Sequence, residues 1–282
     1  MTSPHPERAL GRAAALLVLA LLPACDVPSG TGGREVRFTL ELATAAAPSR
    51  PAGSFTTSTG WDVTLESAVI ALGPVYLYEN PPHLVARGPA RGPAGGLWDV
   101  LVPPAHAHAG SEHFFGGEVK GEWLGQLAFD ALAPGARLVD TPGTAGGVRS
   151  LSIGLHPPRA SIAGDAGGLG GHHAYVVGVA TRGDLEIPFE GGLDIEAEGN
   201  KREVAGIPLE AELDDGVSVT IELHLEAWFD EAHFDRLTEE SPRGRFLLDR
   251  STQAGAAWFI GARSAAAFSA RGSRPADRGE GL

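Results

Sequence analysis

The stretch that decides the fold is Val217-Ser218-Val219-Thr220-Ile221-Glu222-Leu223-His224-Leu225-Glu226. Apolar and polar residues alternate along its whole length, which is the period-two pattern of a β-strand with one buried face. The turn residues Asp214-Asp215-Gly216 precede it and follow another apolar run at 207–213. Together these stretches predict two strands joined in a β-hairpin.

The same alternation recurs in both directions from this strand. Gly73-Pro74 interrupts the run 69–78, which predicts two short strands or one bulged strand, because proline cannot donate to a central ladder. Glycine and proline, 39 and 21 of 282 residues, fall between the apolar runs. Many short strands separated by such turns predict an all-β fold, a β-sandwich of mostly antiparallel strands. The further predicted strands are 36–42, 61–65, 149–155, 174–181, 185–189 and 193–197.

Helical spacing is confined to the C-terminal third. Apolar residues at helical intervals predict a short helix over 230–237, and an alanine-rich run predicts a C-terminal helix over 254–270, packed on the sandwich. The resulting organisation is a signal peptide at 1–24, a flexible tether at 25–35, a β-sandwich domain at 36–240, a C-terminal helical segment at 241–270 and a disordered tail at 271–282.

The N-terminal residues have the pattern of a secretory signal peptide. Two arginines precede the apolar run 13–22, which is too short to span a bilayer as a helix. It ends in Leu22-Pro23-Ala24-Cys25, which resembles the lipobox of bacterial lipoproteins. The resemblance implies that Cys25 is lipidated and that acyl chains anchor the protein to the inner or outer membrane of a bacterial cell envelope. An ordinary secreted protein with a chance cysteine is the alternative.

Composition limits the partners and the chemistry. The net charge is −13, and removal of Glu7, Arg8 and Arg12 with the signal makes it one unit more negative, which argues against nucleic acid as a partner. Cys25 is the only cysteine and Met1 the only methionine. The mature fold therefore has no disulfide, and any metal site must use histidine, carboxylate or backbone ligands.

Histidines are the strongest candidates for such a site. In extended backbone, His106 and His108 share one face of the chain, and His113 follows closely. Imidazole ligands suit copper or zinc. His172 and His173 open the strand 174–181. Because consecutive strand residues face opposite ways, we expect only one of these two to join a common site, and capping of the strand is the alternative.

Other polar groups carry weaker signals. One strand face carries Glu222, His224 and Glu226, which are either metal ligands or part of a solvated face. A second strand carries acidic residues at 194, 196 and 198, which either bind calcium or are solvated. The five tryptophans fit core packing better than a sugar platform. Neither Gly-x-Ser-x-Gly nor His-Glu-x-x-His occurs, so the sequence names no catalytic constellation and predicts a protein that is not an enzyme.

Two stretches resemble a known family in their order along the chain. These are Trp61 to Ala68 (WDVTLESA) with Val75 to Tyr78 (VYLY), and, after a histidine-bearing loop, Gly171 to Ala180 (GHHAYVVGVA). They are similar to the periplasmic and surface copper-binding β-proteins that accompany di-haem peroxidases in methane-oxidising bacteria. The resemblance implies copper held through histidines near a modified tryptophan. The corresponding candidates are His106, His108, His172 or His173, with Trp61 or Trp98 as the aromatic residue.

Two hypotheses follow for the function. The first is a lipid-anchored envelope protein that binds copper or zinc through histidines and sequesters or delivers the ion, with another envelope protein or a redox partner as recipient. The second is a structural or recognition lipoprotein that binds a glycan or another envelope protein without metal.

Overall fold

The computed structural model describes residues 33–45, 50–82, 117–196 and 202–273. The fold belongs to the compact unit Arg34–Leu282. It consists of two mixed β-sheets with few helices, and most strand pairs are antiparallel, so the prediction of an all-β sandwich is confirmed. Within the described residues, no helix is both long and apolar enough to cross a bilayer.

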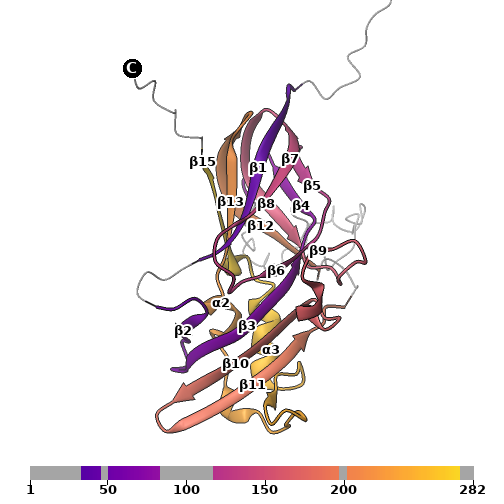
Figure 1. Cartoon of the computed structure of the whole chain (residues 1–282). Helices are drawn as coiled ribbons and strands as arrows, with labels where there is room; N and C mark the ends of the chain where they lie inside the picture. Colours follow the sequence, from indigo (N-terminus) through magenta and orange to yellow (C-terminus); the bar gives the residue numbers. More distant parts are fainter. Residues whose placement is uncertain (1–32, 46–49, 83–116, 197–201, 274–282) are drawn as a thin grey trace, which may run out of the picture. The chain divides into compact units, whose positions relative to one another are not determined.

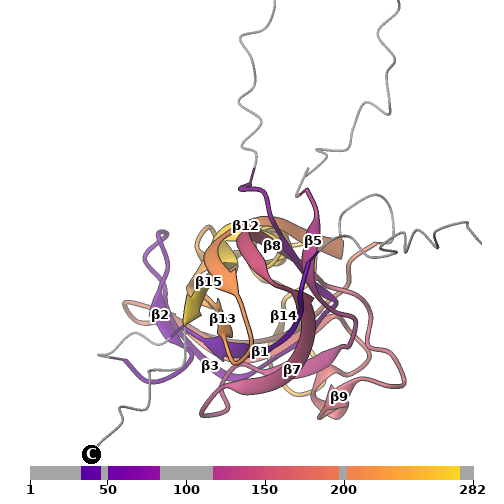
Figure 2. The same ribbon diagram turned by 90° about the horizontal axis from the view of Figure 1, so that it is seen from above.

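The larger sheet has eight strands in the order β12-β8-β4-β5-β7-β1-β13-β15. Their bounds are β1 Glu35–Thr44, β4 Val75–Tyr78, β5 Val119–Trp123, β7 Arg137–Thr144, β8 Gly146–Gly154, β12 Glu203–Leu213, β13 Ser218–Leu223 and β15 Phe268–Ser273. Seen from above, these strands curl into a ring (Figure 2). The edge strands β12 and β15 come close to each other, since a Cβ added at Gly272 would collide with Ala211. The sheet thereby encloses its own apolar face.

The smaller sheet has the order β14-β11-β10-β3-β6-β9, with β2 also paired to β3. Helix α3 covers one of its faces (Figure 1). The strand bounds are β2 Ser54–Thr56, β3 Asp62–Leu72, β6 Leu127–Asp130, β9 Ala163–Gly164, β10 Ala174–Arg182, β11 Leu185–Leu193 and β14 Phe246–Leu247. The helical segments are η1 Ala166–Leu169, α2 Glu226–Phe229, η3 Phe234–Arg236, α3 Gln253–Gly261 and η4 Ala265–Ala267.

The two sheets are joined where the sequence places Gly73-Pro74. β3 ends at Leu72 in the smaller sheet and β4 begins at Val75 in the larger one, which confirms the break into two strands at this point. Only β4 is short, because β3 joins residues 69–72 to the strand predicted at 61–65. Gly73 donates its N–H to the carbonyl of Gly154, and a Cβ at Gly73 would lie 3.0 Å from the ring of Trp123. Only glycine fits this crossing without displacing its neighbours.

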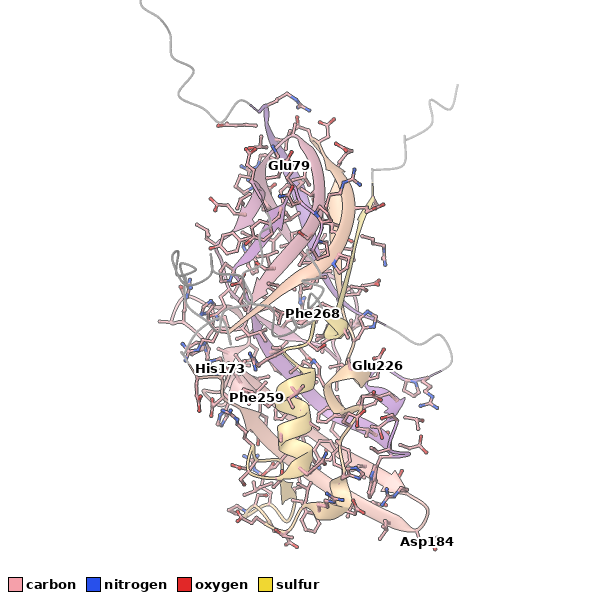
Figure 3. All side chains as sticks on the ribbon, turned by 180° about the vertical axis from the view of Figure 1, so that it is seen from behind. Glu79, His173, Asp184, Glu226, Phe259 and Phe268 are labelled. Atoms are coloured by element: carbon pink, nitrogen blue, oxygen red, sulfur yellow. The ribbon has the colours of Figure 1, made fainter. Side chains whose placement is uncertain are left out.

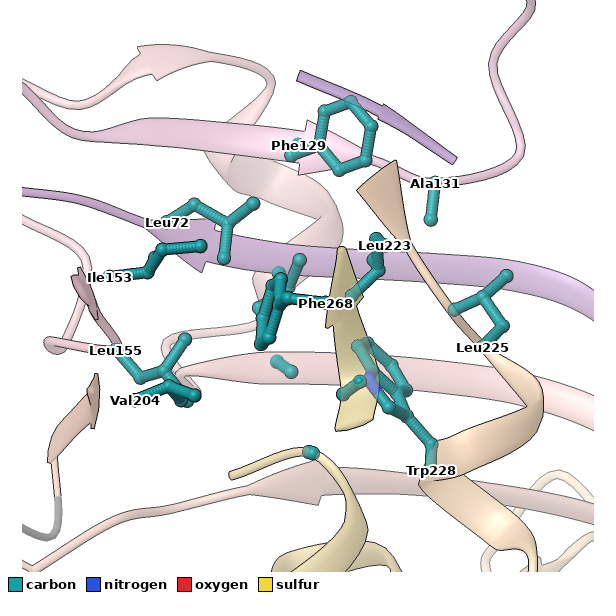
Figure 4. Close-up of a cluster of buried hydrophobic side chains, with 14 of the residues drawn as sticks. Leu72, Phe129, Ala131, Ile153, Leu155, Val204, Leu223, Leu225, Trp228 and Phe268 are labelled. Carbon is teal, nitrogen blue, oxygen red and sulfur yellow. The ribbon is translucent and has the colours of Figure 1, made fainter. Parts of the chain in front are cut away.

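The core is continuous between the sheets. Figure 4 shows Leu72 and Phe129 of the smaller sheet meeting Ile153, Leu223 and Phe268 of the larger sheet. Three of the five tryptophans, at positions 61, 228 and 258, are buried to 1% exposure or less, which confirms core packing for them. Trp98 lies outside the described residues.

Three sequence predictions about elements are wrong in detail. β12 and β13 do not pair, although the turn 214–216 joins them, because β12 pairs with β8 while β13 pairs with β1 and β15. The strand predicted at 185–189 extends to Leu193 as β11, and residues 194–196 of the run predicted at 193–197 lie in no strand. The helix predicted over 230–237 is replaced by α2, which starts earlier, and the short η3.

The C-terminal segment also differs from its prediction. The helix expected over 254–270 ends at Gly261, and residues 268–273 form the strand β15 instead. Phe268 explains the change, because its side chain is 4% exposed and enters the core only if the chain is extended beside β13. The predicted tail therefore begins inside a strand, and residues 274–282 lie outside the described part.

Candidate functional site

Only two of the six candidate site residues lie in the described part of the structure. Cys25 lies in segment 1–32, and His106, His108 and His113 lie in segment 83–116, all outside the described residues. His172 and His173 are described, between η1 and β10.

Backbone hydrogen bonds fix the position of His173. Gly170 and Gly171 have φ angles of 57° and 90°, a left-handed turn that glycine adopts without strain. After this turn, the N–H of His173 donates to the carbonyl of Leu193 at 2.9 Å, and its carbonyl accepts from the N–H of Ala71 at 2.8 Å. The residue is therefore held between β11 and β3 where β10 begins.

Asp194, the residue after β11, contacts both histidines. Its Oδ2 lies 2.9 Å from Nδ1 of His172, and its Oδ1 lies 3.5 Å from Nδ1 of His173. Both histidines precede β10 and contact the same carboxylate, although their side chains differ in exposure. The expectation that only one of them joins a site with the histidines of segment 83–116 stays a prediction. Gly192 leaves room for this arrangement, since an added Cβ would lie 2.6 Å from Nδ1 of His172.

The two imidazoles differ in their surroundings. The side chain of His172 is 37% exposed and stacks on Tyr175, whereas that of His173 is 6% exposed. The Nε2 atom of His173 is buried and has no hydrogen-bond partner among the described residues. Burial lowers the pKa of His173, the hydrogen bond with Asp194 opposes this, and the charges of Arg202 and His156 lower the pKa further. The net effect is a lowered pKa, which favours the neutral form of the imidazole.

A cavity of about 380 Å³ lies beside His173. Its walls include Asp194, Arg202 and Trp258, and the Nε of Arg202 donates to the carbonyl of Ile195 at 2.8 Å. Arg250 pairs with Glu196 at 3.2 Å. Asp194 and Glu196 therefore have cationic or imidazole partners, which disfavours the calcium interpretation of this acidic stretch.

The described residues alone do not supply enough ligands for a metal centre. In the described ranges, no group of three or more histidine, cysteine or acidic side chains is arranged to hold a metal ion. His173 offers a neutral, buried nitrogen with a carboxylate behind its other ring nitrogen, which is the arrangement that metal-binding histidines commonly have. The described residues thus fit one anchoring ligand and its supporting carboxylate.

Sequence reasoning missed the pairing of Asp194 with the histidines. A signal for it exists in the sequence Thr181-Arg182-Gly183-Asp184, whose glycine is typical of a tight turn and which sets the register of the β10–β11 hairpin. Counting back from that turn pairs Ala174 with Leu193, and the next pair outward is His173 with Asp194. The approach of His156 and Arg202 depends on other strands, and no local pattern marks it.

Comparison with known proteins gives one distant likeness. No protein-family model matches the chain, and no curated protein is significantly similar to it. Among solved structures, it is similar to MbnP from Methylosinus trichosporium at 10% sequence identity and a TM-score of 0.40, over 80% of this chain and 87% of that one. At this distance the residues of the two proteins are not matched one to one. We therefore assign residue roles from this chain's own geometry.

Proposed function

We propose that the protein is a lipid-anchored component of the bacterial cell envelope that binds copper or zinc through histidines, with His173 as the anchoring ligand. Binding would serve to hold or deliver the ion.

The observation that carries the proposal is the state of the His173 ring. Four buried side-chain nitrogens lack a hydrogen-bond partner among the described residues, and three of them are indole nitrogens, which cannot bind a metal ion. Nε2 of His173 is the fourth, and a metal ion bound there would remove the cost of about 1–3 kcal/mol that an unpartnered buried nitrogen carries. In the binding state Nδ1–H donates to Asp194, which leaves the lone pair of Nε2 for the metal. In the other tautomer Nδ1 accepts the N–H of Ile195, which lies 3.4 Å away. Metal binding selects the first tautomer.

The remaining ligands come from other histidines. His172 shares the carboxylate of Asp194, and the sequence supplies His106, His108 and His113 in segment 83–116. A site of imidazoles and carboxylate suits copper or zinc and excludes the soft thiolate class. Because a ligating imidazole must be neutral, the lowered pKa of His173 favours binding near pH 7.

Elemental analysis tests the metal proposal. Residues 27–282, without a histidine tag, would be exposed to copper or zinc, dialysed and measured by mass spectrometry. We expect about one ion per chain, lost in the His106→Ala/His108→Ala variant and in His173→Ala but kept in His233→Ala. A folded protein that retains no metal would contradict the proposal and favour recognition of a glycan or an envelope protein.

Membrane anchoring through Cys25 needs a separate test. We expect the full chain to partition into the detergent phase of Triton X-114 and a Cys25→Ser variant to remain in the aqueous phase. Equal partitioning of both forms would contradict lipidation and favour an ordinary secreted protein.

A further inference from the structure

A second cluster of polar side chains lies at the end of β13. His224 follows β13, Glu226 begins α2, and Ser269 is on the edge strand β15. Strand alternation places Ser269 on the outer face of β15, because the neighbouring Phe268 enters the core (Figure 4). Ser269 and His224 are 45 residues apart in the chain, and only the pairing of β15 with β13 brings them together.

The three side chains form a hydrogen-bonded relay. Nε2 of His224 lies 2.8 Å from Oγ of Ser269, and Nδ1 of His224 lies 3.3 Å from Oε1 of Glu226. One ring nitrogen thus faces a hydroxyl and the other a carboxylate. This is the order in which a base is set beside a nucleophile in serine hydrolases of unrelated folds.

Nearby charges leave this relay intact. Glu222 lies 3.5 Å from Oγ of Ser269, which is a longer contact than that to His224. The guanidinium of Arg271 pairs with the other oxygen of Glu222 and neutralises it. The hydroxyl proton of Ser269 therefore has its shorter acceptor in Nε2 of His224.

An open groove of about 470 Å³ adjoins the relay. His224, Glu226 and the segment from Arg50 to Thr56 line it. Ser269 is not among the lining residues, but its Oγ lies 2.8 Å from Nε2 of His224, which is. Phe55 and Leu225 give it an apolar floor, and Arg50 contributes a cation at its edge. Figure 3 shows Glu226 and His173 on opposite sides of α3, and this groove shares no lining residue with the cavity beside His173.

We propose that Ser269 is an activated nucleophile, with His224 as its general base and Glu226 as a positioning residue, and that it acts on small carboxylic esters bound in this groove. An acyl chain fits the apolar floor, and a carboxylate elsewhere on the substrate would meet Arg50. The inference is independent of the proposed metal site.

The reaction balances with water as the only co-reactant. Oγ of Ser269 bonds to the ester carbonyl carbon while its proton passes to Nε2 of His224. The carbon–oxygen bond to the leaving alkoxide breaks, and His224 gives that alkoxide the proton. Water then attacks the acyl-serine with the same base, which releases the acid and restores the hydroxyl.

Labelling with a fluorophosphonate tests the activation step without requiring turnover. Oγ would bond to phosphorus as fluoride leaves, and the added mass would appear on the tryptic peptide Ser264–Arg271 (SAAAFSAR), where fragmentation separates Ser264 from Ser269. The reaction is run on the folded protein with EDTA present. Hydrolysis of 4-nitrophenyl acetate is followed in parallel.

We expect labelling at Ser269, none there in Ser269→Ala, and a rate at least about 100-fold lower in His224→Gln. Glu226→Gln should slow labelling and Glu226→Asp should restore part of it, which loss of folding would not do. Ser273→Ala is the matched control, since Ser273 is on the same strand and no hydrogen bond to a histidine is found for it among the described residues. Circular dichroism verifies that each variant is folded. Labelling of wild type no faster than of the urea-unfolded chain, or unchanged in folded His224→Gln, would overturn the proposal.

Discussion

Replacing His173 by leucine should stabilise the metal-free protein and remove its response to metal. The substitution eliminates the buried Nε2, which has no partner in the described part of the chain and whose burial is then unfavourable by about 1–3 kcal/mol. Two contacts are lost, a 3.4 Å bond from the N–H of Ile195 and a 3.5 Å contact with Asp194. Both are long, and the carboxylate is 67% exposed, so solvent replaces much of what it loses. The N–H of Ile195 also loses this acceptor, but a bond of 3.4 Å is weak. We therefore expect a net gain of at most about 1 kcal/mol, because leucine fills a similar volume.

Metal should reverse the order of stability. A ligand present at 100 times its dissociation constant stabilises the folded state by about 2.7 kcal/mol. Differential scanning fluorimetry should therefore show His173→Leu melting above wild type by about 2–4 °C with EDTA and below it with excess zinc. His172→Leu is the matched control, and it should gain no stability without metal because its Nδ1 is bonded to Asp194 at 2.9 Å. Destabilisation of metal-free His173→Leu would refute the reasoning, since it would mean that the imidazole is structurally satisfied.

Two further predictions concern the same region. Burial lowers the pKa of His173 and that of His156 below the ordinary value of 6.5, so the unfolded state binds protons that the folded state does not. The free energy of unfolding, measured with urea, should therefore fall as the pH drops below about 6.5, less steeply in His173→Leu, and equal slopes would argue against this cause. Gly192→Ala should displace the His172 ring from Asp194 and destabilise the fold by about 1–3 kcal/mol, whereas Gly147→Ala, which meets only the mobile end of Glu212, should be nearly neutral in the same urea titration.

The sequence predicts the faces of the strands better than their partners. In β13 the alternation shows that Val219, Ile221 and Leu223 are buried, as the structure confirms. It carries no information about the neighbouring strand, because any strand with a buried face satisfies it. The turn at 214–216 accordingly suggests a hairpin, yet Asp215 accepts the N–H of Arg37 and pairs with Arg34, so the turn is tied to β1.

The C-terminal error has a different origin. Alanine favours helix wherever the chain is free to choose, and residues 254–267 contain many alanines. Burial of Phe268 and pairing with β13 outweigh this propensity over the last strand. Tertiary packing of this kind is visible only once the position of the larger sheet is known.

The sequence predicts contacts within a candidate site only where the two residues belong to the same hairpin, because the turn then fixes which residues are paired. The pair His173 and Asp194 follows from a hairpin that the sequence already indicates. The contact of Ser269 with His224 requires β15, which the sequence does not predict, so the relay could not be found from the sequence. His224 and Glu226 interact because the chain leaves β13 after Leu223 and bends into α2.

The position of β1 has a consequence for how the chain acquires its structure. This first strand pairs with β7, about 100 residues later, and in parallel with β13, about 180 residues later. During synthesis one edge of β1 stays without its partner until residue 144 has emerged, and the other edge until residue 223 has emerged. Such distant pairing gives a high contact order, which places folding in the range of about milliseconds to seconds. A chaperone that shields the open edge of β1 until β13 has been synthesised would therefore keep this strand from pairing with a wrong partner.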